Sequence, residues 1–308
     1  MMMKLPSGWY AFGAVQEFSR KKPTPMRRFG LDLVVWRTQA GQWVVQEDRC
    51  PHRSAQLSLG RIEKDCLSCP FHGFQFNAHG RCELIPEVGK AAPGLQVRTF
   101  PVLEKSMFLW VYWGDQSGDD HFKVPEEIPW FFDLDHAPLA YGQVKHRWMA
   151  HFTRCVENQL DYVHLPFVHR KTIGRGLDPK KKVTWEISEK KIRLLLNPED
   201  SETSFFEFLY PNVWRLYIQP KLVQVVFFVP VDEQETAIYQ RSYQGFLQVA
   251  GLRKAVAWLS AQMNRVILGE DYGVVRSQHP SDVRLAQDER LVASDRGIQA
   301  FRAWISGS

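Results

Sequence analysis

Two short stretches, Cys50-Pro51-His52-Arg53 and Cys69-Pro70-Phe71-His72-Gly73, decide how the rest of this chain is organised. Each stretch supplies one cysteine and one histidine, and sixteen residues separate His52 from Cys69. Two thiolates on one iron and two imidazoles on the other are the ligands of an asymmetric [2Fe–2S] cluster. The pattern therefore predicts that Cys50, His52, Cys69 and His72 hold such a cluster.

A structural zinc site is the alternative, because two cysteines and two histidines also bind Zn²⁺. Finger-type zinc sites usually pair cysteine with cysteine and histidine with histidine, whereas each stretch here is mixed. Cys66 also forms a C-x-x-C with Cys69. A zinc site that combines this pair with Cys50 or His52 therefore stays open, although the spacing favours the cluster.

Length and composition are those of an ordinary soluble globular protein. A chain of 308 residues suits two domains, and a hydrophobic content of 44% with 24% charged residues lets both bury a core. The net charge of +5 includes no arm or stripe of Lys and Arg, so we expect no nucleic-acid partner. The longest apolar run, 225–231, is far shorter than the ~20 residues that cross a bilayer. Five unevenly spaced cysteines are typical of a reducing cytoplasm and not of a disulfide framework.

The first part of the chain predicts an all-β domain that carries the four cluster ligands on hairpin tips. Strands are expected at 9–16, 31–37, 43–45, 74–76, 97–103 and 107–113. The polar, turn-rich stretch 114–129 then marks a boundary. The expected domains are therefore 1–115 and 116–308.

A second metal motif follows this boundary. Glu157, Asp161 and His164 recur at i, i+4 and i+7, which on a helix would put them on one face. His169 would lie about 140° round from His164 on a straight helix, but Pro166 is expected to break the helix and let His169 swing back. Two histidines and a carboxylate are the ligands of a non-haem Fe(II) site that keeps positions open for O₂ and substrate. We predict His164 and His169 as its nitrogen ligands.

The rest of the chain predicts an antiparallel sheet followed by helices. Strands are expected at 183–187, 192–196, 204–209, 213–218, 223–229 and 237–243, with turns at 197–198 and at later Pro and Asn positions. A long amphipathic helix is expected from Gly251 to about 278, and a final helix over 294–305.

Asp271 is the predicted third iron ligand. It lies four residues after Ile267 on the expected apolar face of the long helix, where an unpaired carboxylate would be costly unless a cation partnered it. Glu270 points about 100° away and is the runner-up, with an ordinary surface position as its expected role. Glu157 and Asn158 are expected to line the site or to support its ligands.

With C-P-H-R, C-P-F-H-G, Asp161-x-x-His164-x4-His169 and Asp271 in this order, the chain resembles the large (alpha) subunit of the Rieske non-haem iron oxygenases, also called ring-hydroxylating oxygenases. The resemblance implies an α+β fold, with an N-terminal Rieske domain and a catalytic domain built on a helix-grip (START-like) antiparallel sheet with a long C-terminal helix. Ser54 stands where many relatives have glycine. The short chain is similar to the compact demethylase and monooxygenase branch.

The resemblance also implies a head-to-tail homotrimer, in which the cluster of one subunit faces the mononuclear iron of the next. Asp161 would then be the carboxylate that bridges His72 of one subunit and His164 of its neighbour. The residues support this position independently, because a carboxylate three residues before a ligating histidine can accept a hydrogen bond from its free ring nitrogen.

The function expected from these features is that of a terminal oxygenase, which uses O₂ to hydroxylate or oxidatively demethylate a small apolar, aromatic or alkaloid-like substrate. No glycine-rich dinucleotide fingerprint follows a strand, so NAD(P)H is expected to act through a separate reductase, with or without a ferredoxin. Three alternatives stay open: dihydroxylation of an aromatic ring by the same machinery, a Rieske-type electron carrier without oxygenase activity, and a zinc-stabilised binding module.

Overall fold

The computed structural model describes residues 2–114, 124–196, 204–247, 249 and 252–307. The chain divides into two compact units, Met1–Ile128 and Pro129–Ser308. This division falls thirteen residues after the expected one at 115/116. Three features named from the sequence lie outside the described residues: 115–123 of the expected linker, the turn at 197–198, and Gly251 at the expected start of the long helix.

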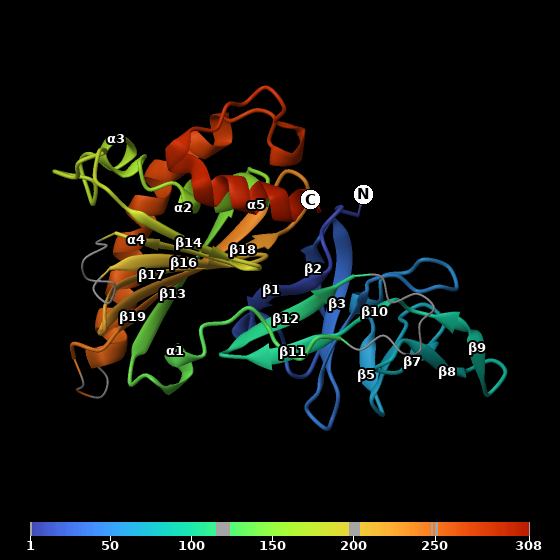
Figure 1. Cartoon of the computed structure of the whole chain (residues 1–308). Coiled ribbons are helices and arrows are strands. Elements are labelled where there is room, and N and C mark those ends of the chain that lie inside the picture. The colour runs from blue at the N-terminus through green and yellow to red at the C-terminus, as the bar shows by residue number, and fades with distance from the viewer. Residues whose placement is uncertain (1, 115–123, 197–203, 248, 250–251, 308) are drawn as a thin grey trace. The chain divides into compact units, whose positions relative to one another are not determined.

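Unit 1 is built from three antiparallel sheets (Figure 1). The first has the order β1 (Gly8–Ala14), β12 (Phe108–Trp113), β11 (Val102–Lys105). The second has the order β10 (Thr99–Phe100), β4 (Trp43–Glu47), β3 (Leu31–Arg37), β2 (Thr24–Arg28). The third has the order β5 (Arg61–Glu63), β6 (Cys66–Ser68), β7 (Gln75–Phe76), β8 (Arg81–Ile85), β9 (Lys90–Gln96). Single turns of 3-10 helix, η1 (Val15–Glu17) and η2 (Leu57–Leu59), interrupt the strands.

The sequence did not predict β2, β5, β6, β8 and β9, which are short or polar. β9 contains both Pro93 and Gly94, and a strand with a proline is tolerated at a sheet edge, which is where β9 lies. Two apolar cores hold this unit together, and the second includes Cys50 and Cys69. The cluster loops are therefore anchored by the cysteines themselves.

Unit 2 is organised around one seven-stranded antiparallel sheet (Figure 1). Its order is β13 (Ala140–Trp148), β19 (Thr236–Gln244), β18 (Leu222–Pro230), β17 (Val213–Gln219), β16 (Phe205–Leu209), β15 (Lys191–Leu195), β14 (Thr184–Ser188). Six of these strands were predicted within two residues. β13 was missed because its sequence AYGQVKHRW mixes charged and polar residues with few apolar ones. The expected α+β fold with a large antiparallel sheet is confirmed.

Helices complete unit 2. They are α1 (Asp133–His136), α2 (Phe152–Leu160), α3 (Leu165–Val168), α4 (Leu252–Ser277) and α5 (Arg296–Ser306), with the 3-10 turns η3 (Val283–Leu285) and η4 (Ala293–Asp295). The long helix α4 packs across β13 and β19, and α5 packs against β14 and β15. Within the described ranges, no helix is both long and apolar enough to cross a membrane.

The buried face of α4 is not the face that the sequence predicted. The large apolar residues that set the expected face are exposed; they are Leu252, Val256, Leu259, Met263 and Val266. The residues that face the sheet are instead Ala257, Ala261, Asn264, Leu268, Asp271 and Val275. The reason is a close approach: a Cβ at Gly142 of β13 would overlap the backbone carbonyl of Ala257, so only small side chains fit between helix and sheet. Asp271 is nevertheless buried, because it belongs to the true inner face.

Candidate metal centres

The two Cys/His loops of unit 1 share one backbone pattern. In each loop the cysteine N–H donates to the carbonyl five residues on, and the cysteine carbonyl accepts from the N–H four residues on. The distances are 2.8 and 2.9 Å in the loop of Cys50, and 2.8 and 3.0 Å in the loop of Cys69. The residue four positions on is left-handed in both loops, with φ of 61° at Ser54 and 70° at Gly73. Glycine adopts this conformation without strain, which explains why a glycine suits the position of Ser54.

These loops bury the thiols and expose the imidazoles. Cys50 and Cys69 are each 2% exposed, whereas His52 and His72 are exposed with ring centroids 4.8 Å apart. His52 also stacks on Phe74 at 4.7 Å. Burial, with a contribution from the neighbouring Cys69, raises the pKa of the Cys50 thiol to about 11. Iron would supply the positive charge that such buried thiolates need, so the residues fit a cluster with its histidine side at the surface.

Cys66 does not belong to this set. It lies on β6, and burial raises the pKa of its thiol, followed by the charges of Glu83, Asp65 and Cys82. The groups that act on Cys66 are thus those of the five-stranded sheet and not the cluster ligands. This position does not favour the zinc site that the Cys66–Cys69 spacing had left open.

A second set of metal-binding atoms converges in unit 2. Asp271 Oδ1 lies 2.9 Å from His169 Nε2 and 3.5 Å from His164 Nε2, and the three side chains form a group whose ligand atoms all lie within 4.8 Å. Two ligands at right angles, each about 2.1 Å from a metal, are about 3 Å apart. His169 and Asp271 are 1% exposed, and His164 is 12% exposed. The geometry fits one divalent metal ion with open positions.

The chain reaches this geometry in a way that the sequence only partly predicted. Helix α2 ends at Leu160, and Asp161 is already extended, with φ −85° and ψ 124°. The expected single helical face for Asp161 and His164 is therefore wrong. Pro166 does not end a helix but lies in the first turn of the short helix α3. A proline is tolerated there because backbone N–H groups of the first turn have no partner within the helix. One turn of α3 then separates His164 at its start from His169 at its end, and both rings face the same point.

The electrostatics of this group call for a cation. Burial alone would lower the pKa of His164, but the carboxylates of Asp161 and Asp271 outweigh it and raise that pKa to about 9. Within the described part of the chain, His164 Nε2 and Asp271 Oδ1 are buried without a hydrogen-bond partner. Buried polar atoms without partners are costly, and a shared metal ion would satisfy them together.

Glu270, the runner-up ligand that was expected at an ordinary surface position, lies against His169 instead. Its carboxylate lies 2.7 Å from His169 Nδ1 and accepts a 2.7 Å bond from the Thr172 hydroxyl. A carboxylate on the free nitrogen of a metal-binding histidine fixes the tautomer and the orientation of the ring. Two adjacent residues of α4 thus lie against the two nitrogens of one imidazole, Glu270 at Nδ1 and Asp271 at Nε2. In the sequence, the only indication of this arrangement was that the predicted ligand Asp271 has a second carboxylate, Glu270, directly before it.

Asp161 stands beside His164 but is not hydrogen-bonded to it. Its Oδ2 lies 3.7 Å from His164 Nδ1, and its Oδ1 accepts a 2.8 Å bond from the Val163 N–H. The side chain is 32% exposed. The carboxylate is therefore close to the second nitrogen of His164 and also open to the outside.

Glu157 and Asn158 are not among the residues that line the cavity beside the metal group. Glu157 is buried in an ion network, 3.0 Å from Arg154 and 2.5 Å from Arg302. The expectation that Glu157 lines the site is therefore wrong. Its position on α2 points its side chain towards Arg302 of α5 and away from the cavity. Asn158 also lies off the cavity wall, and its Nδ2 is buried without a partner among the described residues.

A cavity of about 270 Å³ adjoins the three converging side chains. We call it the Asp271 cavity. Its lining residues come from strands β16 to β19, from the positions next to β15 and β16, from α4 and from the 159–173 segment; they are Gln159, Asp161, Tyr162, His164, Leu165, His169, Ile173, Leu196, Ser204, Phe206, Trp214, Leu216, Ile218, Gln224, Val226, Gln240, Ile267, Leu268 and Asp271. It is mostly apolar, and its volume suits a small organic molecule.

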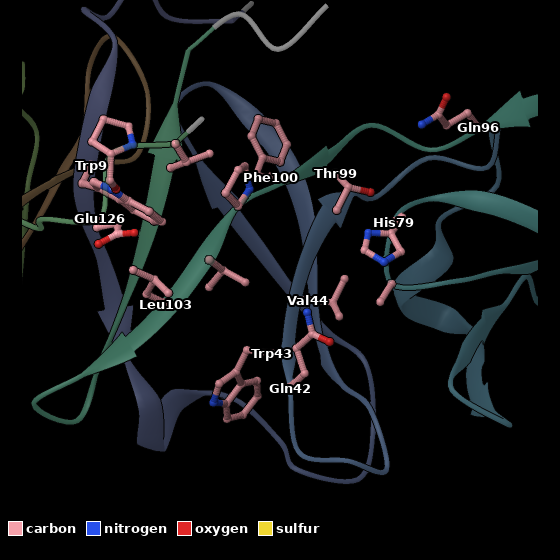
Figure 2. Close-up of a pocket in the computed structure, with 15 residues that line it drawn as sticks. Trp9, Gln42, Trp43, Val44, His79, Gln96, Thr99, Phe100, Leu103 and Glu126 are labelled. Carbon is pink, nitrogen blue, oxygen red and sulfur yellow. The ribbon is translucent and has the colours of Figure 1, made fainter. Parts of the chain in front are cut away.

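Unit 1 has a wider, more open groove of about 710 Å³, shown in Figure 2. Trp9, Trp43, Phe100 and Leu103 line it, with His79 at one side (Figure 2). Among the described residues that line it, there is no cysteine and one histidine, so they form no cluster of metal-binding side chains.

A further group of ionisable side chains in unit 2 joins three separate segments. His151 Nε2 lies 3.2 Å from Glu233 Oε2, and these atoms and a carboxylate oxygen of Asp282 all lie within 4.8 Å of one another. Arg284 already pairs with Asp282 through Nε at 3.0 Å and Nη2 at 2.6 Å. Since Arg284 neutralises this carboxylate, the group is an ion network that holds the segments together.

The two loops of unit 1 indicate an iron–sulfur domain, which is joined to a second unit with its own group of converging His and Asp side chains. Residues 8–101 match the family model described as the Rieske [2Fe-2S] domain. The chain is 33% identical over 142 residues to the toluene-4-sulfonate monooxygenase system iron-sulfur subunit TsaM1 of Comamonas testosteroni, a match that covers 46% of this chain and 40% of that protein. It is 34% identical over 179 residues to the chloroplastic pheophorbide a oxygenase of Oryza sativa subsp. japonica, covering 54% and 33%.

The structure is similar to that of the Pseudomonas putida CBB5 NdmA QL mutant with theobromine, with a TM-score of 0.77 and 25% identity over 97% of this chain and 89% of that one. The chain spans half or less of the length of the curated relatives that it matches. These findings confirm the resemblance drawn from the two motifs: the chain carries a Rieske [2Fe-2S] domain and is similar to proteins named as oxygenases. The cluster interpretation of the opening loops thereby replaces the zinc alternative.

Proposed function

We propose that this chain is the terminal oxygenase of a Rieske system. Cys50, His52, Cys69 and His72 would hold the cluster, and His164, His169 and Asp271 would hold a mononuclear Fe(II). When bound, these groups supply single electrons and activate O₂ for hydroxylation of a substrate, or for its dealkylation where the hydroxylated carbon bears oxygen or nitrogen. The observation that carries the proposal is the convergence of His164 Nε2, His169 Nε2 and Asp271 Oδ1 at the wall of an apolar cavity.

The side chains around the metal group have separate tasks in this proposal. Glu270 holds the His169 ring by its far nitrogen at 2.7 Å, and the Thr172 hydroxyl donates to the same Glu270 oxygen at 2.7 Å. The aliphatic and aromatic lining of the cavity would exclude water and hold the substrate against the open metal positions. Three protein ligands leave room for both O₂ and substrate, which a four-ligand structural site would not.

Electrons would come from NAD(P)H through a separate reductase, with or without a ferredoxin. We infer a homotrimer in which Asp161 bridges His72 of one subunit and His164 of the next. The exposed stripe on α4, formed by Leu252, Val256, Leu259, Met263 and Val266, supports assembly, because exposed apolar surface of this extent is typical of surfaces that another chain covers. The described cysteines are all free and buried, which supports a reducing, cytoplasmic location.

Metal and acid-labile sulfide analysis of the purified protein tests the proposal first. An oxygenase should hold about three Fe per chain, two of them with sulfide, and an electron carrier about two. Zinc without sulfide would contradict both. Anaerobic reduction, followed by one turnover with O₂ against a panel of small aromatic and N- or O-methylated compounds, should then give a product. One added oxygen or a lost methyl group supports monooxygenation, and two added oxygens would indicate ring dihydroxylation.

A further inference from the structure

The Asp271 cavity is apolar over most of its wall but carries polar atoms at defined places. Among the described residues that line it, none is Lys or Arg. An anionic ligand would therefore find no cationic side chain along the described wall to replace its lost hydration. The two polar groups of interest are the Trp214 indole and the Gln240 amide.

Trp214 presents a donor without a partner. Its side chain lies on β17 and is 7% exposed, and within the described residues its Nε1–H is buried without a hydrogen-bond partner. A tryptophan N–H can only donate. A buried indole N–H normally finds an acceptor, so one is expected from a bound molecule.

Gln240 presents an acceptor whose orientation is set by a chain of hydrogen bonds. Gln240 Nε2 donates to Gln224 Oε1 at 2.9 Å, and Gln224 Nε2 donates to Asn264 Oδ1 at 3.3 Å. Asn264 Nδ2 then donates to Ser242 Oγ at 3.2 Å. Each amide in this chain donates in the same direction, which leaves Gln240 Oε1 at its end, buried and without a partner in the described part of the chain.

The sheet places these two groups on either side of a short residue. Trp214 of β17 pairs with Val226 of β18, and Val226 pairs with Gln240 of β19, so the three share one face. Two strand spacings put the Cα atoms of Trp214 and Gln240 about 9.5 Å apart. Val226 between them has the shortest side chain of the three, and the donor and the acceptor stand on the strands to either side of it.

We propose that Trp214 and Gln240 select an uncharged, compact substrate that carries one hydrogen-bond acceptor and one donor. The acceptor faces the Trp214 N–H, the donor faces Gln240 Oε1, and the apolar body lies over Val226 against the aliphatic wall. This inference rests on the proposed function in that it takes the Asp271 cavity to be the substrate site. A site that buries unpaired polar groups rejects analogues that lack the matching group.

Binding to the iron-loaded enzyme without O₂ tests the selection separately from turnover. The probes are the three isomeric methoxyphenols, which scan the donor–acceptor spacing and are uncharged at pH 7, their dimethoxybenzene counterparts without a donor, and the matching methoxybenzoates. Calorimetry should show one methoxyphenol binding about tenfold more tightly than its dimethoxybenzene, with the benzoate weakest. Binding of every methoxyphenol within twofold of its dimethoxybenzene, or tighter binding of a benzoate, would overturn the proposal.

Variants assign the preference to its residues. Gln240→Met removes the acceptor at nearly constant size and should abolish the preference for phenol over ether. Trp214→Phe should weaken the phenol and the ether equally. Gln159→Met is the matched control, because Gln159 lines the same cavity outside the hydrogen-bond chain. Loss of the preference in that control would contradict the assignment to Gln240.

The probe comparison on the wild-type enzyme still decides the proposal if a variant does not fold. Turnover is a separate result. An enzyme that shows the phenol preference but forms no product with O₂ would retain this inference and lose the proposed function. An enzyme that oxidises methoxyarenes without any preference would retain the function and lose the inference.

Discussion

Glu270 and Asp271 are neighbours on one helix but act on opposite sides of one histidine. Adjacent helical positions diverge by about 100°, and His169 lies between the two carboxylates, with Nδ1 2.7 Å from Glu270 and Nε2 2.9 Å from Asp271. The sequence pattern predicted Asp271 as the ligand and treated Glu270 as a surface residue. What separates the two roles is the position of His169, which is 101 residues earlier in the chain.

Glu270→Ala should weaken Fe(II) binding by about 10- to 100-fold, because His169 loses the carboxylate that fixes its ring. Titration of iron-depleted protein with Fe(II) measures this, and the visible absorption of the cluster should not change. Glu270→Gln keeps an oxygen that can accept from His169 Nδ1–H, so its loss should be smaller. Wild-type affinity in the alanine variant would show that Glu270 does not orient the ligand.

At the scale of one element, α4 shows how packing overrides hydrophobic pattern. Its most apolar stripe is exposed, and its inner face is made of small and polar residues such as Ala257, Ala261 and Asn264. The helix lies close to β13 because Gly142 has no side chain there. The short helix-to-sheet distance brings Asp271 to the cavity wall and Asn264 within 3.3 Å of the Gln224 amide.

Gly142→Ala should destabilise the protein by about 1–3 kcal/mol, since the new methyl group overlaps the Ala257 carbonyl and forces α4 outward. The same shift should weaken Fe(II) binding. Gly273→Ala is the matched control: a Cβ at that exposed helical position meets nothing within 4 Å, so it should stabilise by about 0.5–1 kcal/mol. Chemical denaturation measures both. An unchanged free energy of unfolding for the Gly142 variant would contradict the close packing.

The His151 network makes the stability of unit 2 depend on pH. Burial lowers the pKa of His151 from 6.5 to about 4, although Asp282 opposes the shift and Arg284 and Arg154 reinforce it. The unfolded chain therefore binds a proton below pH 6.5 that the folded chain does not take up until about pH 4. Stability from this group should be complete above pH 6.5 and should fall by about 1.4 kcal/mol per pH unit between these values.

His151→Gln should flatten this acid slope. Denaturant unfolding at several pH values between 4 and 7 measures the slope in the variant and in the wild-type protein. His79→Gln, at an exposed position of unit 1, is the control and should leave the slope unchanged. An identical slope in His151→Gln and the wild-type protein would show that this histidine does not set the acid sensitivity.

At the scale of the whole molecule, each unit carries one complete set of metal-binding residues. Unit 1 has the exposed His52 and His72 at its cluster loops, and unit 2 has the partly exposed Asp161 beside His164. A carboxylate placed outside the metal group and close to its histidine suits a contact with another subunit. The proposed electron path depends on that contact.

Asp161→Ala should leave the iron and sulfide contents unchanged but lower product formation per reduced cluster by about 10- to 100-fold. Single-turnover oxidation of the cluster by stopped-flow absorption measures the step directly. Asp161→Asn separates the two roles of this side chain, because it keeps the acceptor for the Val163 N–H but lacks the charge. Cluster oxidation at the wild-type rate in the alanine variant would exclude the bridging role.

The sequence by itself determined the Rieske domain and pointed to the second group of metal-binding side chains. The cluster ligands and the pair His164 and His169 lie in short motifs, where spacing and residue type restrict which metal centres can form. Strands β14 to β19 were also predictable, since their alternating and β-branched runs are local signals.

Only the tertiary structure decided which residues support the site and shape the cavity. Glu157 was predicted at the site and lies in an ion network, and Glu270 was predicted at the surface and lies against His169. Trp214 and Gln240 come from separate strands and share one face of the sheet only through their pairing with Val226. The inner face of α4 is set by Gly142 on a strand that the sequence did not predict. Each of these outcomes depends on packing between residues far apart in the chain, where local periodicity carries no information.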